Sequence, residues 1–159
     1  MTPASGVDGY SRGEPSRYLI RPEDRELEQR IAGQLEQAWQ CQLVSFGEGS
    51  WIDWYAMRNG LPVAAIELKG RVVPSTKFTM LYLSWRKWIA LTSAARMDHI
   101  KAVVVWSLAD GLFWCRPNEL TDCRVIMAGR TDRGRANDWE PVLLVPVARL
   151  RRVIPLRQV

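Results

Sequence analysis

The segment from residue 51 to residue 70 constrains the fold most, because its pattern is typical of a β-hairpin that ends in charged residues. Two runs rich in apolar, aromatic and β-branched residues, 51–57 and 61–68, flank the turn residues Asn59 and Gly60. This pattern predicts two antiparallel strands joined by a tight turn. Both faces of the second run are mainly apolar, so we expect the hairpin to lie inside a packed sheet.

Charged side chains stand where such a sheet should be apolar. The second run ends in Glu67 and Lys69, and the first run contains Asp53. Strand side chains alternate, so Glu67 and Lys69 should share one face with Val63 and Ala65. The opposite face should carry Ala64, Ile66 and Leu68. A carboxylate and an ammonium in such a place are costly to desolvate unless they serve a ligand or each other.

An acid on one strand, followed by acid-x-Lys at the end of the next, resembles the motif of the PD-(D/E)xK nucleases. The matching residues are Asp53, Glu67 and Lys69, and Ile52 stands where the family usually has proline. The resemblance implies a Mg²⁺ or Mn²⁺ site formed by Asp53, Glu67 and the backbone carbonyl of Leu68. Carboxylate oxygens suit Mg²⁺, and a lysine can orient the attacking water and neutralise the phosphate in the transition state.

The same three residues also have an ordinary interpretation. Carboxylate and lysine pairs are abundant, and an acid upstream of an E-x-K triplet is a weak pattern by itself. The strand context and the order of the remaining elements favour the nuclease interpretation.

An amphipathic helix is predicted from about Pro22 to about Trp39, because a proline and acids open it and apolar residues recur at helical spacing. Glu28 lies at the border of the apolar stripe, so it is the helix acid best placed to look across the sheet. Many PD-(D/E)xK enzymes carry a catalytic acid on the first helix, and the resemblance implies this role for Glu28. The alternative is a solvated flank.

The remaining elements follow from alternation and helical spacing. Ser84 is typical of an N-cap, and the helix after it should bury Trp85, Trp88, Ile89, Thr92 and Ala95 and end near Met97. Strands are expected at 40–46, 79–83, 102–107, 112–116, 124–128 and 142–147. This order matches the α-β-β-β-α-β core of the resembled family. It implies an α/β (α+β), restriction-endonuclease-like fold in which helices flank a mixed sheet, with extra C-terminal strands.

Four further residues are candidates for nucleic-acid contacts. The stretch TMLYLSWRKW is similar to one that follows E-x-K in nuclease-like proteins of phages and prophages, where a serine and a lysine start a helix behind the site. Ser84 and Lys87 match these two residues. Arg71 and Lys77 lie in a polar loop beside the proposed site and could contact phosphate. The alternative for this loop is an ordinary connector.

The register of the hairpin decides whether the two acids can meet. A two-residue turn at 59–60 would place Asp53 opposite Ile66, which is the wrong face for a shared metal ion. Because a one-residue slip exchanges the faces, Asp53 and Glu67 converge only with an odd loop or a bulge. A three-residue loop at 59–61 would place Asp53 directly opposite Glu67, and we expect that register or a bulged equivalent.

The length of 159 residues suits one domain, and we expect a disordered tail at 1–17 followed by a single nuclease-like domain at 18–159. The chain has neither an apolar run long enough for a bilayer nor an opening signal segment, which predicts a cytoplasmic protein, in the host cytoplasm if a phage encodes it. The cysteines are widely spaced and lack metal-binding groupings, so we expect reduced thiols. They are Cys41, Cys115 and Cys123.

The formal net charge of +5 supports a polyanionic partner. The segment 129–140 carries three arginines and Trp139, and it could either track a nucleic-acid backbone or be a solvated excursion. Trp85, Trp88 and Trp106 fit core positions. His99 is expected to be a helix cap or a surface residue, because no nucleophile motif accompanies it.

The leading hypothesis is therefore a Mg²⁺-dependent DNA endonuclease of the resolvase-like kind, a deoxyribonuclease resembling Holliday-junction resolvases. DNA is the expected partner, a homodimer is one expected assembly, and no membrane is involved. One alternative is a non-catalytic nucleic-acid-binding or phage structural protein on the same fold, and a weaker one is RNA as the substrate.

Overall fold

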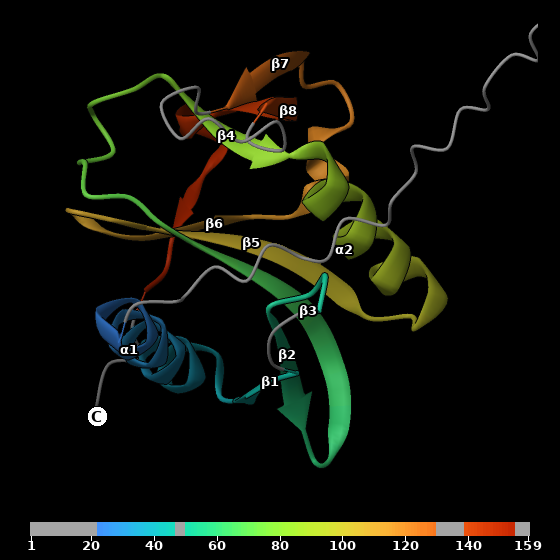
Figure 1. Ribbon diagram of the computed structural model, residues 1–159. Helices are drawn as coiled ribbons and strands as arrows, with labels where there is room; N and C mark the ends of the chain where they lie inside the picture. The colour runs from blue at the N-terminus through green and yellow to red at the C-terminus, as the bar shows by residue number, and fades with distance from the viewer. Residues whose placement is uncertain (1–21, 47–49, 130–138, 155–159) are drawn as a thin grey trace, which may run out of the picture.

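The computed structural model describes residues 22–46, 50–129 and 139–154 (Figure 1). The predicted tail at 1–17 and positions 130–138 of the arginine-containing segment lie outside the described residues. The elements in chain order are α1 (Pro22–Trp39), β1 (Gln42–Ser45), β2 (Trp54–Arg58), β3 (Leu61–Gly70), β4 (Met80–Ser84), α2 (Trp85–Met97), β5 (Lys101–Leu108), β6 (Gly111–Cys115), η1 (Pro117–Leu120), β7 (Val125–Gly129), β8 (Trp139–Pro146), η3 (Val147–Arg149) and β9 (Arg151–Arg152).

Six strands form a mixed sheet in the order β1-β2-β3-β5-β6-β9. The pair β3 and β5 is parallel, and the other neighbouring pairs are antiparallel. Helices α1 and α2 lie on opposite faces of this sheet (Figure 1). The α-β-β-β-α-β order and the restriction-endonuclease-like fold predicted from the sequence are therefore confirmed.

A second sheet of three strands, in the order β4-β8-β7, was not predicted. The segments 124–128 and 142–147 were expected only as extra C-terminal strands. In the structure β8 pairs with β4 on one side and β7 on the other, above the six-stranded sheet in Figure 1. Leu81 and Leu83 of β4 and Leu143 and Val145 of β8 are buried, so this sheet closes the core on the side of α2.

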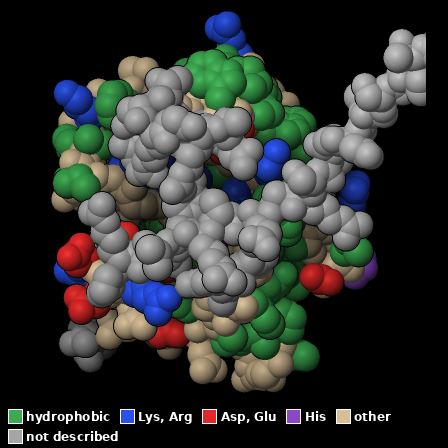
Figure 2. Space-filling model, viewed as in Figure 1, with side chains coloured by type: hydrophobic (Ala, Val, Ile, Leu, Met, Phe, Trp, Pro, Cys, Tyr) green, Lys and Arg blue, Asp and Glu red, His purple; other side chains and the backbone are tan. Residues whose placement is uncertain are grey.

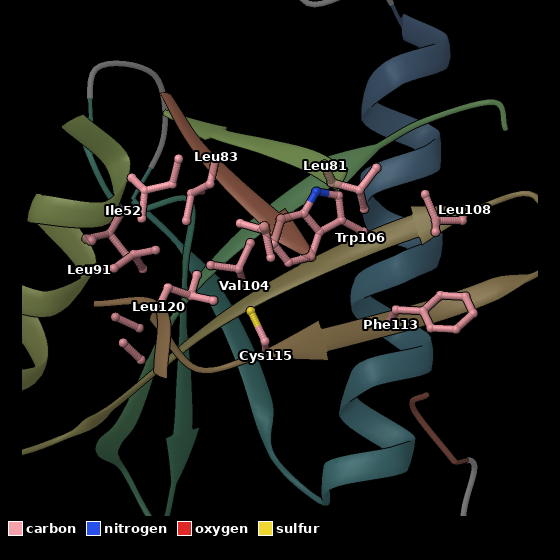
Figure 3. Close-up of a cluster of buried hydrophobic side chains, with 14 residues drawn as sticks. Ile52, Leu81, Leu83, Leu91, Val104, Trp106, Leu108, Phe113, Cys115 and Leu120 are labelled. Carbon is pink, nitrogen blue, oxygen red and sulfur yellow. The ribbon is translucent and has the colours of Figure 1, made fainter. Parts of the chain in front are cut away.

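The core consists of two clusters, one on each face of the six-stranded sheet. The cluster beside α2 surrounds Trp106, which is fully buried among the side chains drawn in Figure 3. The cluster beside α1 includes Leu35, Ile66 and Val105. Strand β5 contributes to both clusters, and this explains its nearly unbroken apolar sequence.

Helix α2 buries a slightly different stripe from the one predicted. Trp85, Trp88 and Ala95 pack against the core as expected, but the fully buried residue is Leu91. The prediction that Ile89 is buried is wrong, because its side chain is 43% exposed. A step from Trp88 to Leu91 and Ala95 keeps the i, i+3, i+7 spacing of one face, whereas Ile89 is rotated away.

The end of α2 confirms the expectation for His99. Its φ is +54°, and its side chain is exposed directly after the helix. The Ile100 N–H donates to the Ala95 carbonyl, which is the hydrogen bond of a helix C-terminal motif with a left-handed residue.

The β2–β3 connection is a two-residue turn followed by a bulge. Asn59 and Gly60 have φ values of +51° and +74°, as a primed hairpin turn requires, and Arg58 pairs with Leu61. The predicted three-residue loop is therefore wrong. The register then shifts and skips Val63, which confirms the bulged alternative.

The bulge also changes which residues share a face. Beyond it Trp54 pairs with Ile66, so one further step aligns Asp53 with Glu67. The prediction that Val63 shares a face with Glu67 is wrong, because Val63 packs in the cluster beside α1. The strand β2 also begins at Trp54, and residues 51–53 form bends rather than the predicted start of that strand.

Two smaller expectations can be compared with the described residues. All three cysteines are free thiols, as predicted. Neither described helix is both long enough and apolar enough to cross a membrane.

Candidate active site

Asp53 reaches the site from the bend before β2. The neighbouring Ile52 is buried in the core beside α2, which anchors this bend. The Leu68 N–H donates to Asp53 Oδ2 at 3.2 Å, so the backbone of β3 holds the carboxylate across the hairpin. The bulge and this hydrogen bond together bring Asp53 to the end of β3 where Glu67 lies.

Glu67 is the buried charged residue of the site, with 4% of its surface exposed. Lys69 Nζ lies 3.3 Å from its Oε1, and Lys87 Nζ lies 2.8 Å from its Oε2. In the part of the chain that the structure describes, Oε2 is buried without a well-oriented hydrogen bond, and the Lys87 ammonium is its ion-pair partner. Burial, reinforced by the nearby Asp53, raises the pKa of Glu67 from 4.5 to about 7.

Lys87 joins the two acids from the first turn of α2. Its Nζ donates to Asp53 Oδ1 at 2.7 Å and also lies beside Glu67 Oε2. Burial alone would lower the pKa of Lys87, but the two carboxylates outweigh burial and raise it. The pKa of Asp53 is lowered despite its burial, because Glu67, Lys87 and the Leu68 N–H all favour its ionised form. The surroundings of the two acids therefore differ, because they favour the protonated form of Glu67 and the ionised form of Asp53.

Glu28 is half-buried on α1. Burial raises its pKa, and the negative charge of Asp53 is the next largest cause, so Glu28 lies within electrostatic reach of the site. It has no hydrogen bond or ion pair with the described Asp53, Glu67 or Lys87.

None of the other predicted nucleic-acid contacts has a hydrogen bond or ion pair with the described Asp53 and Glu67. Ser84 directly precedes α2, as predicted. The prediction that its side chain caps the helix is wrong, because the hydroxyl makes no capping hydrogen bond. Its Oγ donates to Glu140 Oε2 at 3.0 Å instead, because β4 and β8 are paired beside it. Arg71 and Lys77 are exposed in the β3–β4 loop. This loop is tied to Asp110, in the turn after β5, through Ser75.

The donor set fits a hard divalent cation. Asp53 and Glu67 present carboxylate oxygens to one point, now filled by the Lys87 ammonium, and Glu67 Oε2 is buried without a well-oriented hydrogen bond. No group of three His, Cys, Asp or Glu side chains suited to a metal occurs in the described part of the chain. Two carboxylates with remaining positions left to water, a backbone carbonyl and phosphate are the usual arrangement for Mg²⁺.

Two features of the site were not predicted from the sequence. Lys87 was predicted as a phosphate contact, and its bridge between the two acids was missed. The signal available was a lysine in the first turn of a helix, where a positive charge opposes the helix dipole. The contact of Ser84 with Glu140 had no signal, because the two residues are 56 positions apart.

Comparisons with known proteins agree with the fold. The family model described as "Phage putative PDDEXK endonuclease" matches residues 18–153. Among solved structures, the chain is similar to Hjc of Archaeoglobus fulgidus, described as a Holliday junction resolvase from an archaeal hyperthermophile. That match has a TM-score of 0.53 and 18% identity, over 78% of this chain and 84% of that chain. The search of curated proteins finds no match. Since the family match covers most of the sequence, the chain belongs to the phage PDDEXK endonuclease family.

Proposed function

We propose that this protein is a DNA endonuclease that depends on Mg²⁺ or Mn²⁺ and uses Asp53, Glu67 and Lys69. The observation that carries the proposal is the meeting of the Asp53 and Glu67 carboxylates at the end of β3, with Lys69 beside the same glutamate. Structural ion pairs are usually exposed, whereas this cluster includes a glutamate that is almost completely buried.

Each residue has a distinct role in the proposal. Asp53, Glu67 and the Leu68 carbonyl would hold the metal, which when bound lowers the pKa of water and stabilises charge on phosphate oxygens. Lys69 would orient the attacking water through its ammonium and offset negative charge as the phosphate is attacked. Glu28 would act as a further acid at the edge of the site.

The substrate would be bound by separate basic side chains rather than by one continuous basic patch. On the face shown in Figure 2, lysine and arginine side chains are spread among acidic and apolar ones. We infer that Arg71, Lys77, Ser84 and Lys87 contact phosphates, and that the net charge of +5 aids encounter with DNA. The fold shared with a Holliday junction resolvase makes branched DNA the first substrate to try, with a homodimer in the cytoplasm as the proposed working form.

A cleavage survey tests this proposal. Purified protein is incubated with supercoiled, linear, single-stranded and four-way branched DNA, and with RNA, in Mg²⁺, in Mn²⁺ and in EDTA. We expect DNA cleavage that requires the metal. Binding to DNA that is insensitive to EDTA, without cleavage of any substrate, would instead support a nucleic-acid-binding protein on this fold.

A further inference from the structure

We propose that Lys87 is an internal counter-cation: it occupies the place between the two acids in the metal-free protein and moves to the substrate phosphate when metal enters. The inference rests on the proposed function and concerns how that same site is controlled. Its basis is the position of one ammonium, 2.7 Å from Asp53 Oδ1 and 2.8 Å from Glu67 Oε2.

Lys87 and a metal bound by both acids would need the same carboxylate oxygens of Asp53 and Glu67. Asp53 Oδ2 accepts the Leu68 N–H, and Glu67 Oε1 faces Lys69. The remaining oxygens, Oδ1 and Oε2, both face Lys87. A divalent cation held by the two acids would need these same oxygens, and an ammonium beside them would repel it strongly.

The Lys87 side chain is able to move away from the two acids. Its side chain is 23% exposed, and the four-carbon stem of a lysine is flexible. It stands in the first turn of α2, where the helix dipole disfavours a positive charge, so the two carboxylates supply the attraction that holds it inward.

The same helix end favours an anion as the next partner. The first-turn N–H groups of α2 receive no side-chain cap from Ser84, whose hydroxyl is bonded to Glu140. Backbone N–H groups at a helix start together with a released ammonium suit a phosphate oxygen. Metal binding would therefore strengthen phosphate binding by freeing Lys87, and the two ligands would be coupled.

Lysine labelling of the wild-type protein tests the exchange without nucleic acid. The protein is treated briefly with a small amine-acylating reagent, with and without saturating Mg²⁺, and the modified lysines are quantified by mass spectrometry. We expect labelling of Lys87 to rise several-fold with Mg²⁺. Labelling of Lys77 and Lys101, which are exposed, should stay unchanged.

A pair of variants gives an independent measurement. Mg²⁺ binding is measured by calorimetry for Lys87→Met and for the exposed control Lys101→Met. We expect Lys87→Met to bind Mg²⁺ at least about tenfold more tightly than wild type does. The reason is that no ammonium has to be displaced and one nearby positive charge is gone. The control should match wild type. If Lys87→Met is poorly folded, the labelling of the wild-type protein still tests whether metal displaces Lys87.

The outcomes separate this inference from the proposed function. If Mg²⁺ binds the wild type but leaves Lys87 labelling unchanged, the exchange is wrong while the metal site stands. If neither Mg²⁺ nor Mn²⁺ binds, both the exchange and the proposed metal-dependent function are wrong. Weaker Mg²⁺ binding by Lys87→Met would also overturn the exchange, because Lys87 would then support the metal rather than compete with it.

Discussion

Glu67 is the residue whose surroundings differ most from those of an ordinary carboxylate. It is almost completely buried, close to Asp53, and paired with two lysines. The sequence was enough to single out Glu67, Lys69 and Asp53, because charged side chains in an apolar hairpin are costly to bury without a partner or ligand. The position of Lys87 in the first turn of a helix indicated an unusual role, but its contacts with both acids depend on how α2 is placed over the sheet.

Replacing Glu67 by glutamine should change how stability depends on pH. The pKa of Glu67 is raised from 4.5 to about 7, so the folded wild type binds more protons than the unfolded chain in that window and loses stability as pH rises through it. Glutamine does not titrate. The stability of Glu67→Gln relative to wild type should therefore rise by about 2–3 kcal/mol between pH 4.5 and pH 8.

Urea unfolding at several pH values in EDTA measures this difference. The lowered pKa of Asp53 acts below its ordinary value of 3.8, so it does not contribute within the window. The exposed Glu26→Gln serves as the control and should follow wild type. A difference that stays constant from pH 4.5 to pH 8 would mean that Glu67 titrates as an ordinary surface acid.

At the scale of single elements, turn chemistry decided what could be predicted. The Asn59-Gly60 pair correctly marked the hairpin, and the requirement that two acids meet correctly demanded a bulge or an odd loop. The choice between them depended on packing, because Val63 turns toward the cluster beside α1. Alternation alone cannot locate a bulge inside a run that is apolar on both faces.

The end of α2 offers a test at this scale. His99 adopts a left-handed conformation that costs a non-glycine residue about 1–2 kcal/mol, whereas glycine adopts it freely at some cost in unfolded-state entropy. We expect His99→Gly to stabilise the protein by about 0.5–1 kcal/mol and to raise the melting temperature by a few degrees. Thermal melts of both proteins check this.

The control for that substitution is His99→Ala, which removes the imidazole but keeps the Cβ. It should give no gain in stability. Equal stabilisation by alanine would show that the imidazole itself, rather than its backbone conformation, is unfavourable at this position.

At the scale of the whole molecule, the order of helices and strands in the six-stranded sheet was predictable, but the second sheet was not. The first sheet follows from local patterns in neighbouring segments. The second depends on β4 pairing with β8, which begins more than fifty residues later in the chain. Such long-range pairing leaves no periodic mark in either segment.

At this scale, the proposed binding to DNA would depend on the charge of the protein. If Arg71 and Lys77 each contact a phosphate, replacing either by alanine should weaken binding to all DNA sequences similarly and reduce the slope of log affinity against log salt by about 1. Fluorescence anisotropy in EDTA over a range of KCl concentrations measures this slope. An unchanged slope for both variants would place the DNA elsewhere.

A suitable control for these two is Arg58→Ala. Arg58 donates to the backbone carbonyls of Trp39 and Gln40, at the connection between α1 and β1. Its replacement should leave the salt slope unchanged.

The most direct test of the central claim is the single-turnover rate of plasmid cleavage in Mg²⁺ by wild type, Asp53→Ala and Lys69→Ala, with the exposed Lys101→Ala as control. Circular dichroism and DNA binding in EDTA show whether the variants remain folded and able to bind. We predict that Asp53→Ala and Lys69→Ala lose cleavage by at least about a thousandfold while binding DNA nearly as wild type does, and that the control cuts normally. Cleavage by either site variant at the wild-type rate would contradict the assignment of this site.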